Sequence, residues 1–416
     1  MSGTLEQALI GKYGEDSLPV LHRIKEEAKS DFLKKGLPKF KEEEYKFTPI
    51  TKVLEKNFTF TEKGGNGNIS SDDLKALVID ANAPTQLFFI NGKFSDELSV
   101  INETDGIVVK NMEAAIKENK DQVVKHFGKL GDDDSFTSLN TALTQDGTFI
   151  EVAKNKVIDQ PVYLYFVNDA LDVEANSFPR NLILSNTGSQ ACVVEKTITI
   201  GKHNAFINSL TEVFVSENAR LDHVRIQNDP DNAFEVTQSK VYQEDNSTYS
   251  AFTATLSGGM VRNNINIISD GQNCESNMYG LYLLDNKTHV DNHTTVDHKQ
   301  PNSYSNELYK GVMDGRSKGV FNGKIYVRQE AQKTNAFQSN NNILLSDNAT
   351  LNTKPQLEIW ADDVKCSHGC TSGQLDEEAI FYLRARGISH EKAIGMLLYA
   401  FANDVVEKLP VAEIRS

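Results

Sequence analysis

The chain has 416 residues, of which 39% are hydrophobic and 24% charged, and its formal net charge is -15. This length allows two or three domains or one large elongated domain, and the acidic balance argues against nucleic acid and against an anionic membrane surface as partners. Four cysteines without a framework spacing, no signal peptide and no apolar stretch long enough to span a membrane lead us to expect a cytoplasmic protein.

The N-terminal part, residues 1–85, is predicted to be a helical region. Apolar residues recur at helical spacing over residues 4–35, and Gly36-Leu37-Pro38 ends this pattern. The next segment, residues 39–49, mixes charged residues with aromatic ones. A solvated loop anchored by its aromatic rings is the favoured interpretation, because charge runs are usually exposed.

Strand-type sequence begins near residue 86. Leu87-Phe88-Phe89-Ile90, followed by Asn91-Gly92, predicts a β-hairpin. Residues 112–143 are predicted to form a helical insertion, and from Thr148 strand signals dominate up to residue 372.

This long strand region repeats one local pattern, in which a short apolar run is followed by Ser and then by an Asn, Asp or Gly turn. Turns every 8 to 12 residues are compatible with a sandwich, a barrel or a solenoid. We favour a β-helix, because the region is too long for one ordinary sandwich. The pattern recurs at residues 182–186, 213–221, 267–271 and 343–351.

Stacked coils would also explain why residues 263–352 are rich in asparagine. Asparagine side chains at equivalent turns of neighbouring coils could hydrogen-bond to one another. The predicted fold class is therefore mainly β, with a β-helix (solenoid) core over residues 86–372 flanked by N-terminal and C-terminal helical regions.

The helical pattern returns in residues 373–416. Asp376 and Ser389 are suited to cap two successive helices, and Gly387 is suited to end the first. This helical pair has a wide apolar surface. It could dock onto the solenoid as a cap, or it could offer a face to a partner.

Cys366, His368 and Cys370 form the tightest cluster of candidate metal ligands. Residues two apart in a strand point to the same face, so the three side chains could converge, and thiolate and imidazole suit iron or zinc. The spacing of a structural zinc site is missing. From these residues alone, a buried cysteine and a hydrogen-bonded histidine are the favoured interpretation.

A second group contains His289, His293 and His298 with Asp291 and Asp297 between them. Metal binding is open here, since His289, Asp291 and His293 have same-face spacing on a strand. Exposed polar strand residues are the favoured interpretation. No nucleotide-binding or hydrolase motif occurs in the sequence.

Several long motifs resemble the SufB/SufD family of iron–sulfur cluster assembly proteins. The resemblance covers the whole chain and is strongest from about residue 289 onward. Gly36-Leu37-Pro38 with residues 44–48 is similar to a diverged form of the N-terminal motif of this family. The other motifs are Val-Phe-Asn-Gly-Lys-Ile-Tyr-Val at 320–327, Ala-Gln-Lys-Thr-Asn-Ala at 331–336, Asn-Asn-Ile-Leu-Leu-Ser at 341–346, Lys-Pro-Gln-Leu-Glu-Ile at 354–359, Ala-Asp-Asp-Val-Lys-Cys-Ser-His-Gly at 361–369, Gly-Gln-Leu-Asp-Glu-Glu at 373–378 and Phe-Tyr-Leu-Arg-Ala-Arg-Gly-Ile at 381–388.

The Lys-Cys-Ser-His-Gly run at 365–369 is similar to the SufD branch of the family, and the N-terminal half lacks the clustered cysteines of SufB. The resemblance implies a β-helix flanked by helical regions. It also implies a complex in which the β-helix core pairs with SufB and the C-terminal helices, residues 376–409, dock the ATPase SufC. ATP hydrolysis by another chain agrees with the absence of a nucleotide motif here.

Carried over by position, His368 resembles the histidine placed at the SufB interface, where the nascent cluster forms, and Cys366 lies two positions away as in the family. Cys370 departs from the pattern, because a small residue such as alanine is usual there. A neutral variation is favoured over a spare ligand. The resemblance implies a non-catalytic scaffold subunit with no tightly bound cofactor and a transient iron–sulfur cluster at the SufB interface.

Two alternatives belong to other classes: a β-helix enzyme that acts on polysaccharide, and a zinc-stabilised structural solenoid. Polysaccharide enzymes of this fold are usually secreted, so the N-terminal sequence and the C-terminal helical pair count against the first. The isolated chain could be a monomer or a homodimer, and binding of a metal or a flavin by it stays open.

Overall fold

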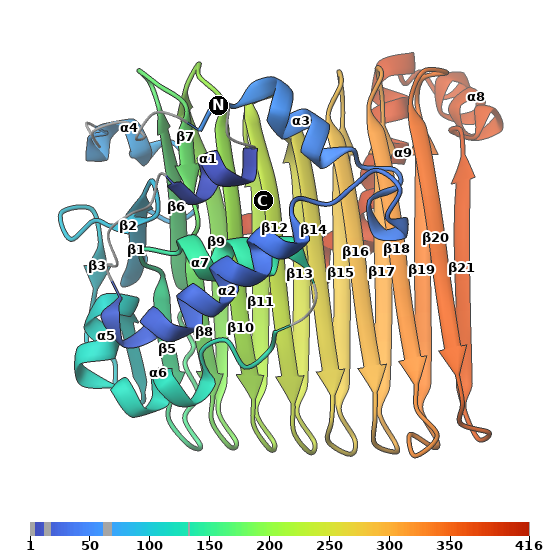
Figure 1. Cartoon of the computed structure of the whole chain (residues 1–416). Coiled ribbons are helices and arrows are strands. Elements are labelled where there is room, and N and C mark those ends of the chain that lie inside the picture. Colours follow the sequence, from blue (N-terminus) through green and yellow to red (C-terminus); the bar gives the residue numbers. More distant parts are fainter. Residues whose placement is uncertain (1–4, 12–17, 61–68, 132–133, 416) are drawn as a thin grey trace.

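Two long, mostly parallel sheets form the body of the protein and wind into a β-helix (Figure 1). The computed structural model describes residues 5–11, 18–60, 69–131 and 134–415. Sheet A has the strand order β2-β1-β6-β9-β11-β13-β15-β17-β19-β21, and sheet B has the order β20-β18-β16-β14-β12-β10-β8-β5-β4. The prediction of a mainly β chain with a solenoid core is confirmed.

The strands of sheet A are β1 (Thr85–Ile90), β2 (Lys93–Phe94), β3 (Val100–Ile101), β6 (Val162–Ala170), β9 (Gln190–Gly201), β11 (Arg220–Asn228), β13 (Thr248–Ser257), β15 (Glu275–Leu284), β17 (Tyr304–Met313), β19 (Asn335–Leu344) and β21 (Lys365–Gly373). Those of sheet B are β4 (Ile107–Asn111), β5 (Thr148–Val152), β7 (Ala175–Ser177), β8 (Arg180–Ser185), β10 (Ala205–Val215), β12 (Ala233–Gln243), β14 (Met260–Ser269), β16 (His289–His298), β18 (Lys318–Val327) and β20 (Thr350–Ile359).

Each full coil contains one strand of sheet B, a turn, one strand of sheet A and a second turn. The turn from sheet B to sheet A contains one residue with positive φ in coil after coil, and asparagine is one of the few non-glycine residues that tolerate this conformation. This backbone requirement is a physical reason for the recurring asparagines. The row consists of Asn155, Gly188, Asn218, Asn246, Asn273, Asn302 and Lys333.

Hydrogen bonding between turn asparagines of neighbouring coils is confirmed for one pair. The Asn273 side chain donates to Asn246 Oδ1 over 3.0 Å. Asn263 and Asn292 also pair, over 3.0 Å, but inside the solenoid and not at a turn. The asparagine-rich stretch therefore serves two purposes, because some asparagines shape turns and others satisfy each other in the interior.

The predicted hairpin at Asn91-Gly92 is confirmed. Ile90 pairs with Lys93 in antiparallel register, and Asn91 and Gly92 have φ values of 48° and 80°. The predicted helical insertion at 112–143 corresponds to three helices, α5 (Met112–Glu118), α6 (Lys120–His126) and α7 (Ser135–Leu143), although residues 132–133 lie outside the described part.

Helices cover the outer faces of both sheets (Figure 1). α2 and α7 lie in front of sheet B, and α9 lies against β15 and β17 of sheet A. Within the predicted helical stretch 4–35, residues 4 and 12–17 lie outside the described part. The remaining helical elements are α1 (Leu5–Gly11), η1 (Pro19–Leu21), α2 (His22–Lys35), η2 (Glu43–Tyr45), α3 (Ile50–Asn57), α4 (Ser71–Lys75), α8 (Glu377–Ala385), α9 (His390–Val406) and α10 (Ala412–Arg415).

The C-terminal caps are confirmed. Asp376 accepts hydrogen bonds from the first turn of α8, Ser389 accepts one from Lys392 N in α9, and Gly387 between the helices has a φ of 86°. α9 docks onto the solenoid, where Lys310 Nζ of β17 lies 2.6 Å from an Asp404 carboxylate oxygen. α8 projects beyond the body of the molecule (Figure 1). Of the two predicted alternatives, docking onto the solenoid thus applies to α9, whereas α8 leaves a face uncovered.

Candidate functional site

The β-helix ends in an uncovered coil formed by β20 and β21. Each of these strands pairs with a strand of the preceding coil, β20 with β18 and β21 with β19, and each stands last in its sheet. Among the described residues, no further strand covers this end. The outer edge of both strands therefore presents backbone N–H and C=O groups that another chain could use.

The last strand places the three candidate ligands on its inward face. Cys366, His368 and Cys370 are in register with Ala336, Gln338 and Asn340 of β19, and all three β19 residues are buried between the sheets. The candidate ligands therefore continue interior columns of the solenoid, but no next coil covers them. His368 is exposed and the two cysteines are half-buried, so His368 does not have the environment of a core histidine.

The two cysteines differ in their surroundings. Cys370 Sγ lies 2.9 Å from Thr353 Oγ1 of β20, so it closes a contact between the two sheets across the last coil. Cys366 packs in a small apolar cluster that includes Ala336 and Ala361. Burial raises the pKa of the Cys366 thiol, so this thiol would lose its proton mainly when a metal binds.

This arrangement supplies only part of a metal-binding site. Successive same-face positions on a strand are about 7 Å apart along the backbone. In the described part of the chain, no group of three or more His, Cys, Asp or Glu residues is arranged to hold a metal ion. A tetrahedral iron or zinc site needs four ligands, so Cys366 and His368 would need donors from outside this chain.

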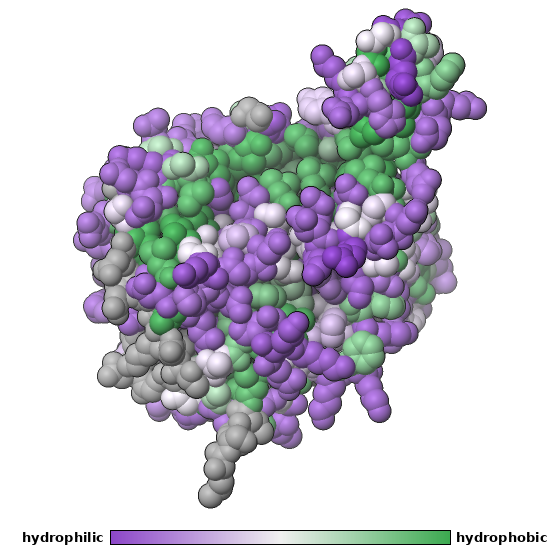
Figure 2. Space-filling view, turned by 90° about the horizontal axis from the view of Figure 1, so that it is seen from above, coloured by the Kyte–Doolittle hydropathy of each residue, from purple (hydrophilic) through white to green (hydrophobic). Residues whose placement is uncertain are grey.

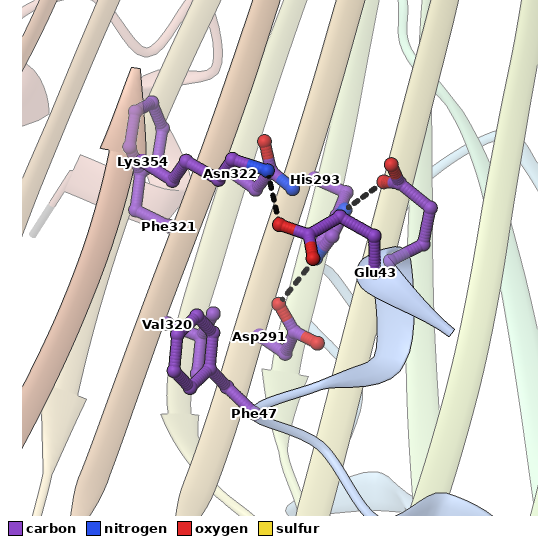
Figure 3. Close-up of a pocket in the computed structure, with 9 residues that line it drawn as sticks. Glu43, Phe47, Asp291, His293, Val320, Phe321, Asn322 and Lys354 are labelled. Carbon is purple, nitrogen blue, oxygen red and sulfur yellow. Dashed lines mark hydrogen bonds and ion pairs between the residues drawn. The ribbon is translucent and has the colours of Figure 1, made fainter. Parts of the chain in front are cut away.

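The second histidine group lies elsewhere, on the outer face of sheet B, and residues 43–48 cover it (Figure 3). Asp291 is only 1% exposed and forms an ion pair of 2.6 Å with Arg262. His293 lies between two carboxylates, 2.9 Å from Asp291 and 3.3 Å from Glu44. The interpretation of exposed polar strand residues is wrong here, because the group forms a buried ion-pair network.

The electrostatics of this network keep the carboxyl groups of Glu44 and Asp291 ionised. The hydrogen bond from His293 is the largest influence on Glu44 and, with Lys324, lowers the pKa of this carboxyl to about 2 although burial opposes ionisation. Burial also opposes ionisation of Asp291, but His293 and Arg262 outweigh it and hold its pKa well below the ordinary value. Burial lowers the pKa of His289 to about 4, so this ring is neutral at physiological pH.

The segment that covers the network, residues 43–48, acts as a brace across four strands of sheet B. Its contacts reach Arg262 in β14, His293 in β16, Lys324 in β18 and Lys354 in β20. Residues 39–43 are exposed and the Tyr45 ring is buried, as the prediction of a solvated loop anchored by its rings requires, whereas the burial of the polar Thr48 was not predicted. The brace thereby reaches the uncovered last coil, where Lys354 lies 2.5 Å from Glu43.

His298 belongs to neither group. Its side chain points into the solenoid, is fully buried and lies 2.9 Å from Ser305 Oγ, whereas Asp297 pairs with Arg328 on the outside over 2.7 Å. The alternation of a strand separates the two residues, so the five residues of this sequence cluster do not share one site.

Comparison with known proteins agrees with this architecture. Residues 166–401 match the family model described as SUF system FeS cluster assembly, SufBD core domain, and residues 7–164 match the SufBD protein N-terminal region. The chain belongs to the SufBD family. The match to the core model contains the long parallel strands from β9 to β21 and the whole of α8.

Individual SufBD relatives span nearly the whole chain. An iron–sulfur cluster assembly SufBD family protein of Synechocystis is 30% identical over 99% of this chain and 91% of its own length. The iron–sulfur cluster assembly protein SufD of Escherichia coli is 30% identical over 91% of this chain and 86% of its own length. The chloroplastic protein ABCI7 of Arabidopsis thaliana is 29% identical over 96% and 84%.

These matches confirm that the chain is a SufD-like member of the SUF system for iron–sulfur cluster assembly. Its scaffold character agrees with the fold, since the β-helix presents the candidate ligands at one end and helices on its sides. None of the helices in the described ranges combines the length and the apolar character that crossing a membrane requires.

Proposed function

We propose that this chain is a non-catalytic scaffold subunit that pairs with SufB and contributes Cys366 and His368 to a nascent iron–sulfur cluster at the shared interface. The observation that carries the proposal is the position of these side chains. They occupy inward-facing positions of the last coil, where no following coil covers them. The cytoplasm is the compartment we expect, because free thiols persist in a reducing environment.

The uncovered edges of β20 and β21 support pairing through the β-helix core. A partner with a matching terminal coil could continue both sheets by backbone hydrogen bonds, as in strand addition generally. Such a coil would cover His368 and Cys366 and bring its own side chains opposite them. Without SufB, the same edges are open to a second copy of this chain.

The chemistry of the two side chains suits a cluster that is passed on. Thiolates hold iron–sulfur clusters, and imidazole replaces thiolate in some of them. Two donors from this subunit would leave the remaining iron ligands to SufB. A site completed by two chains can be opened when the chains separate, which suits transient assembly better than tight storage.

The C-terminal helices support docking of the ATPase SufC. Phe381 of α8 and Tyr399 of α9 are 75% and 72% exposed, and Tyr382 of α8 and Met396 of α9 are exposed as well. Large exposed aromatic side chains of this kind mark interaction surfaces. β21 ends at Gly373 and α8 begins at Glu377, so a movement of α8 would act directly on the strand that carries Cys366 and His368.

The variant His368→Ala tests the proposed site in the complex reconstituted with SufB and SufC. We expect cluster formation, followed by its visible absorbance, to fall by about tenfold or more, because a missing ligand costs at least as much as a missing supporting group. The matched control is Ser367→Ala, which changes the neighbouring outward position of β21 and should leave assembly unchanged.

Gel filtration of both variants would show whether the complex still forms. Unaltered cluster formation by the His368→Ala complex would contradict the proposed role of this residue. Equal losses for the two variants would contradict it as well, because the effect would then come from the edge strand in general and not from an inward-facing ligand.

A further inference from the structure

A cavity of about 510 Å³ lies between α3 and the turns that lead into β12, β14 and β16 of sheet B. The apolar floor of this cavity consists of Val53, Phe234 and Met260. Its rim carries three lysines, which we call the lysine rim: Lys52, Lys56 and Lys287.

The lysine rim concentrates positive charge in a chain whose net charge is -15. Lysines elsewhere, such as Lys310 and Lys354, pair with carboxylates at 2.6 and 2.5 Å. Among the described residues, none of the three rim lysines has a carboxylate partner, and Asp231 is the single acidic residue that lines the cavity. Three lysines and one aspartate leave a local charge of +2 in the lining, which attracts anions.

The walls of the cavity are held in place by packing and hydrogen bonds. Phe234 packs edge-on against Phe58, with ring centres 5.4 Å apart, at the end of α3. The start of α3 is fixed by a hydrogen bond of 2.5 Å from Thr51 Oγ1 to Pro38 O. The cavity is therefore largely pre-formed, as small-molecule sites usually are.

The closed side of the cavity is formed by a neutral group and by main chain. His289 is half-buried, and its ring lies 3.0 Å from Thr48 Oγ1, which fixes its orientation. At Gly259 a side chain would meet the Asp231 carbonyl oxygen at 2.3 Å, so the turn can pass this wall only with glycine. An apolar floor, a neutral end and a cationic rim together define an amphipathic site.

Figure 2 shows the molecule from above, where hydrophobic surface gathers beside the part that projects beyond the body. We infer that the cavity binds a small organic anion, with an aromatic or apolar body on the floor and a phosphate or carboxylate group among the rim lysines. Its volume is in the range of typical small-ligand pockets, and its charge is complementary to such a ligand.

The full-length chain can be tested with three probes that separate the two parts of this chemistry. 1-Naphthyl phosphate has both an aromatic body and an anionic group, 1-naphthol has only the body, and inorganic phosphate has only the anionic group. Titration followed by calorimetry should show that 1-naphthyl phosphate binds about tenfold or more tightly than either fragment, because both halves of the site contribute.

Two sets of substitutions locate the binding. The triple variant K52Q/K56Q/K287Q should weaken binding of 1-naphthyl phosphate by about tenfold or more, because it removes the lysine rim. Val53→Phe should fill the floor and weaken the same probe while leaving inorganic phosphate unchanged. The matched control K93Q/K120Q/K154Q removes the same charge from exposed positions outside the cavity lining and should change the affinity by less than about twofold.

Equal weakening by the rim variant and the control would overturn the inference, because binding would then follow net charge alone. It would also be overturned if none of the probes bound, or if binding survived both the rim variant and Val53→Phe. Loss of contact with a partner subunit in the rim variant, without any probe binding to the wild type, would instead assign the cavity to an acidic protein segment.

Discussion

One column of inward-facing positions in sheet A begins in a closed coil and ends in the open one. In a closed coil of this column, Glu195 is buried and lies 2.6 Å from Arg225 and 3.1 Å from His223. At its end, Cys370 is half-buried and contacts Thr353 of the opposite strand. The column begins with Leu87 and Leu164 and continues through Glu195, Arg225, Thr253, Gly280, Tyr309, Asn340 and Cys370.

The comparison shows that the role of an inward-facing residue depends on whether a following coil covers it. Inside the solenoid, a polar side chain must find partners within the chain, because burial of an unpaired charge is costly. At the last coil the same type of position has no following coil, so its polar groups remain available to another molecule. The difference between the structural positions and the candidate ligand positions lies in the coil that follows and not in residue type.

The largest expected loss of stability follows from a substitution in the closed part of the column. Glu195→Gln removes the buried countercharge of Arg225, and loss of one partner of a buried ion pair costs about 3–5 kcal/mol. Burial opposes ionisation of Glu195, but Arg225 and His223 outweigh it and hold its pKa well below the ordinary value, so the charge is present at neutral pH. Urea denaturation measures the loss in the free energy of unfolding.

Cys370→Ala is the matched control for this prediction, since it changes the open end of the same column. We expect a loss of less than about 1 kcal/mol, because the side chain is small and only partly covered. Similar losses for the two variants would contradict the view that the closed part and the open end of the column have different roles.

An intermediate effect concerns Glu307, which lies in the column that ends at His368. Burial raises the pKa of this carboxyl from 4.5 to about 7, although Thr294 and a hydrogen bond of 2.6 Å from Gln338 favour the charged form. Between these two pH values the folded chain binds more protons than the unfolded chain, so this group lowers stability as pH rises.

Glu307→Gln removes this titration while keeping a similar shape. Relative to the wild type, the variant should gain about 3 kcal/mol in the free energy of unfolding between pH 4.5 and pH 7 and no more above that. Urea denaturation of both proteins at several pH values gives the difference. A difference that does not change with pH would contradict the raised pKa.

The sequence allowed the β-helix to be predicted because its turns impose a backbone requirement that asparagine meets. It also placed Cys366, His368 and Cys370 on one face, since strand alternation is local. The hairpin at Asn91-Gly92 and the caps of α8 and α9 were predictable for the same reason. Each of these features depends on a few neighbouring residues.

The brace over sheet B could not be predicted, because it joins residues far apart in the chain. Thr48 reaches Asp291 across 243 positions, and Glu43 reaches Lys354 across 311. From the sequence, Asp291 and His293 looked like exposed strand residues, and only the covering segment makes them a buried network. The contact of Cys370 with Thr353 was missed for a similar reason, since the two residues face each other from different sheets.

Hydrogen–deuterium exchange on the full-length chain, alone and with SufB or SufC, tests the central claim most directly. The account predicts that SufB slows exchange of backbone amides in β20 and β21, because their open edges become hydrogen-bonded, and that SufC slows exchange in α8 and α9. Unchanged exchange in β20 and β21 on binding SufB, with protection at the opposite end of the solenoid around β1 to β5, would contradict it.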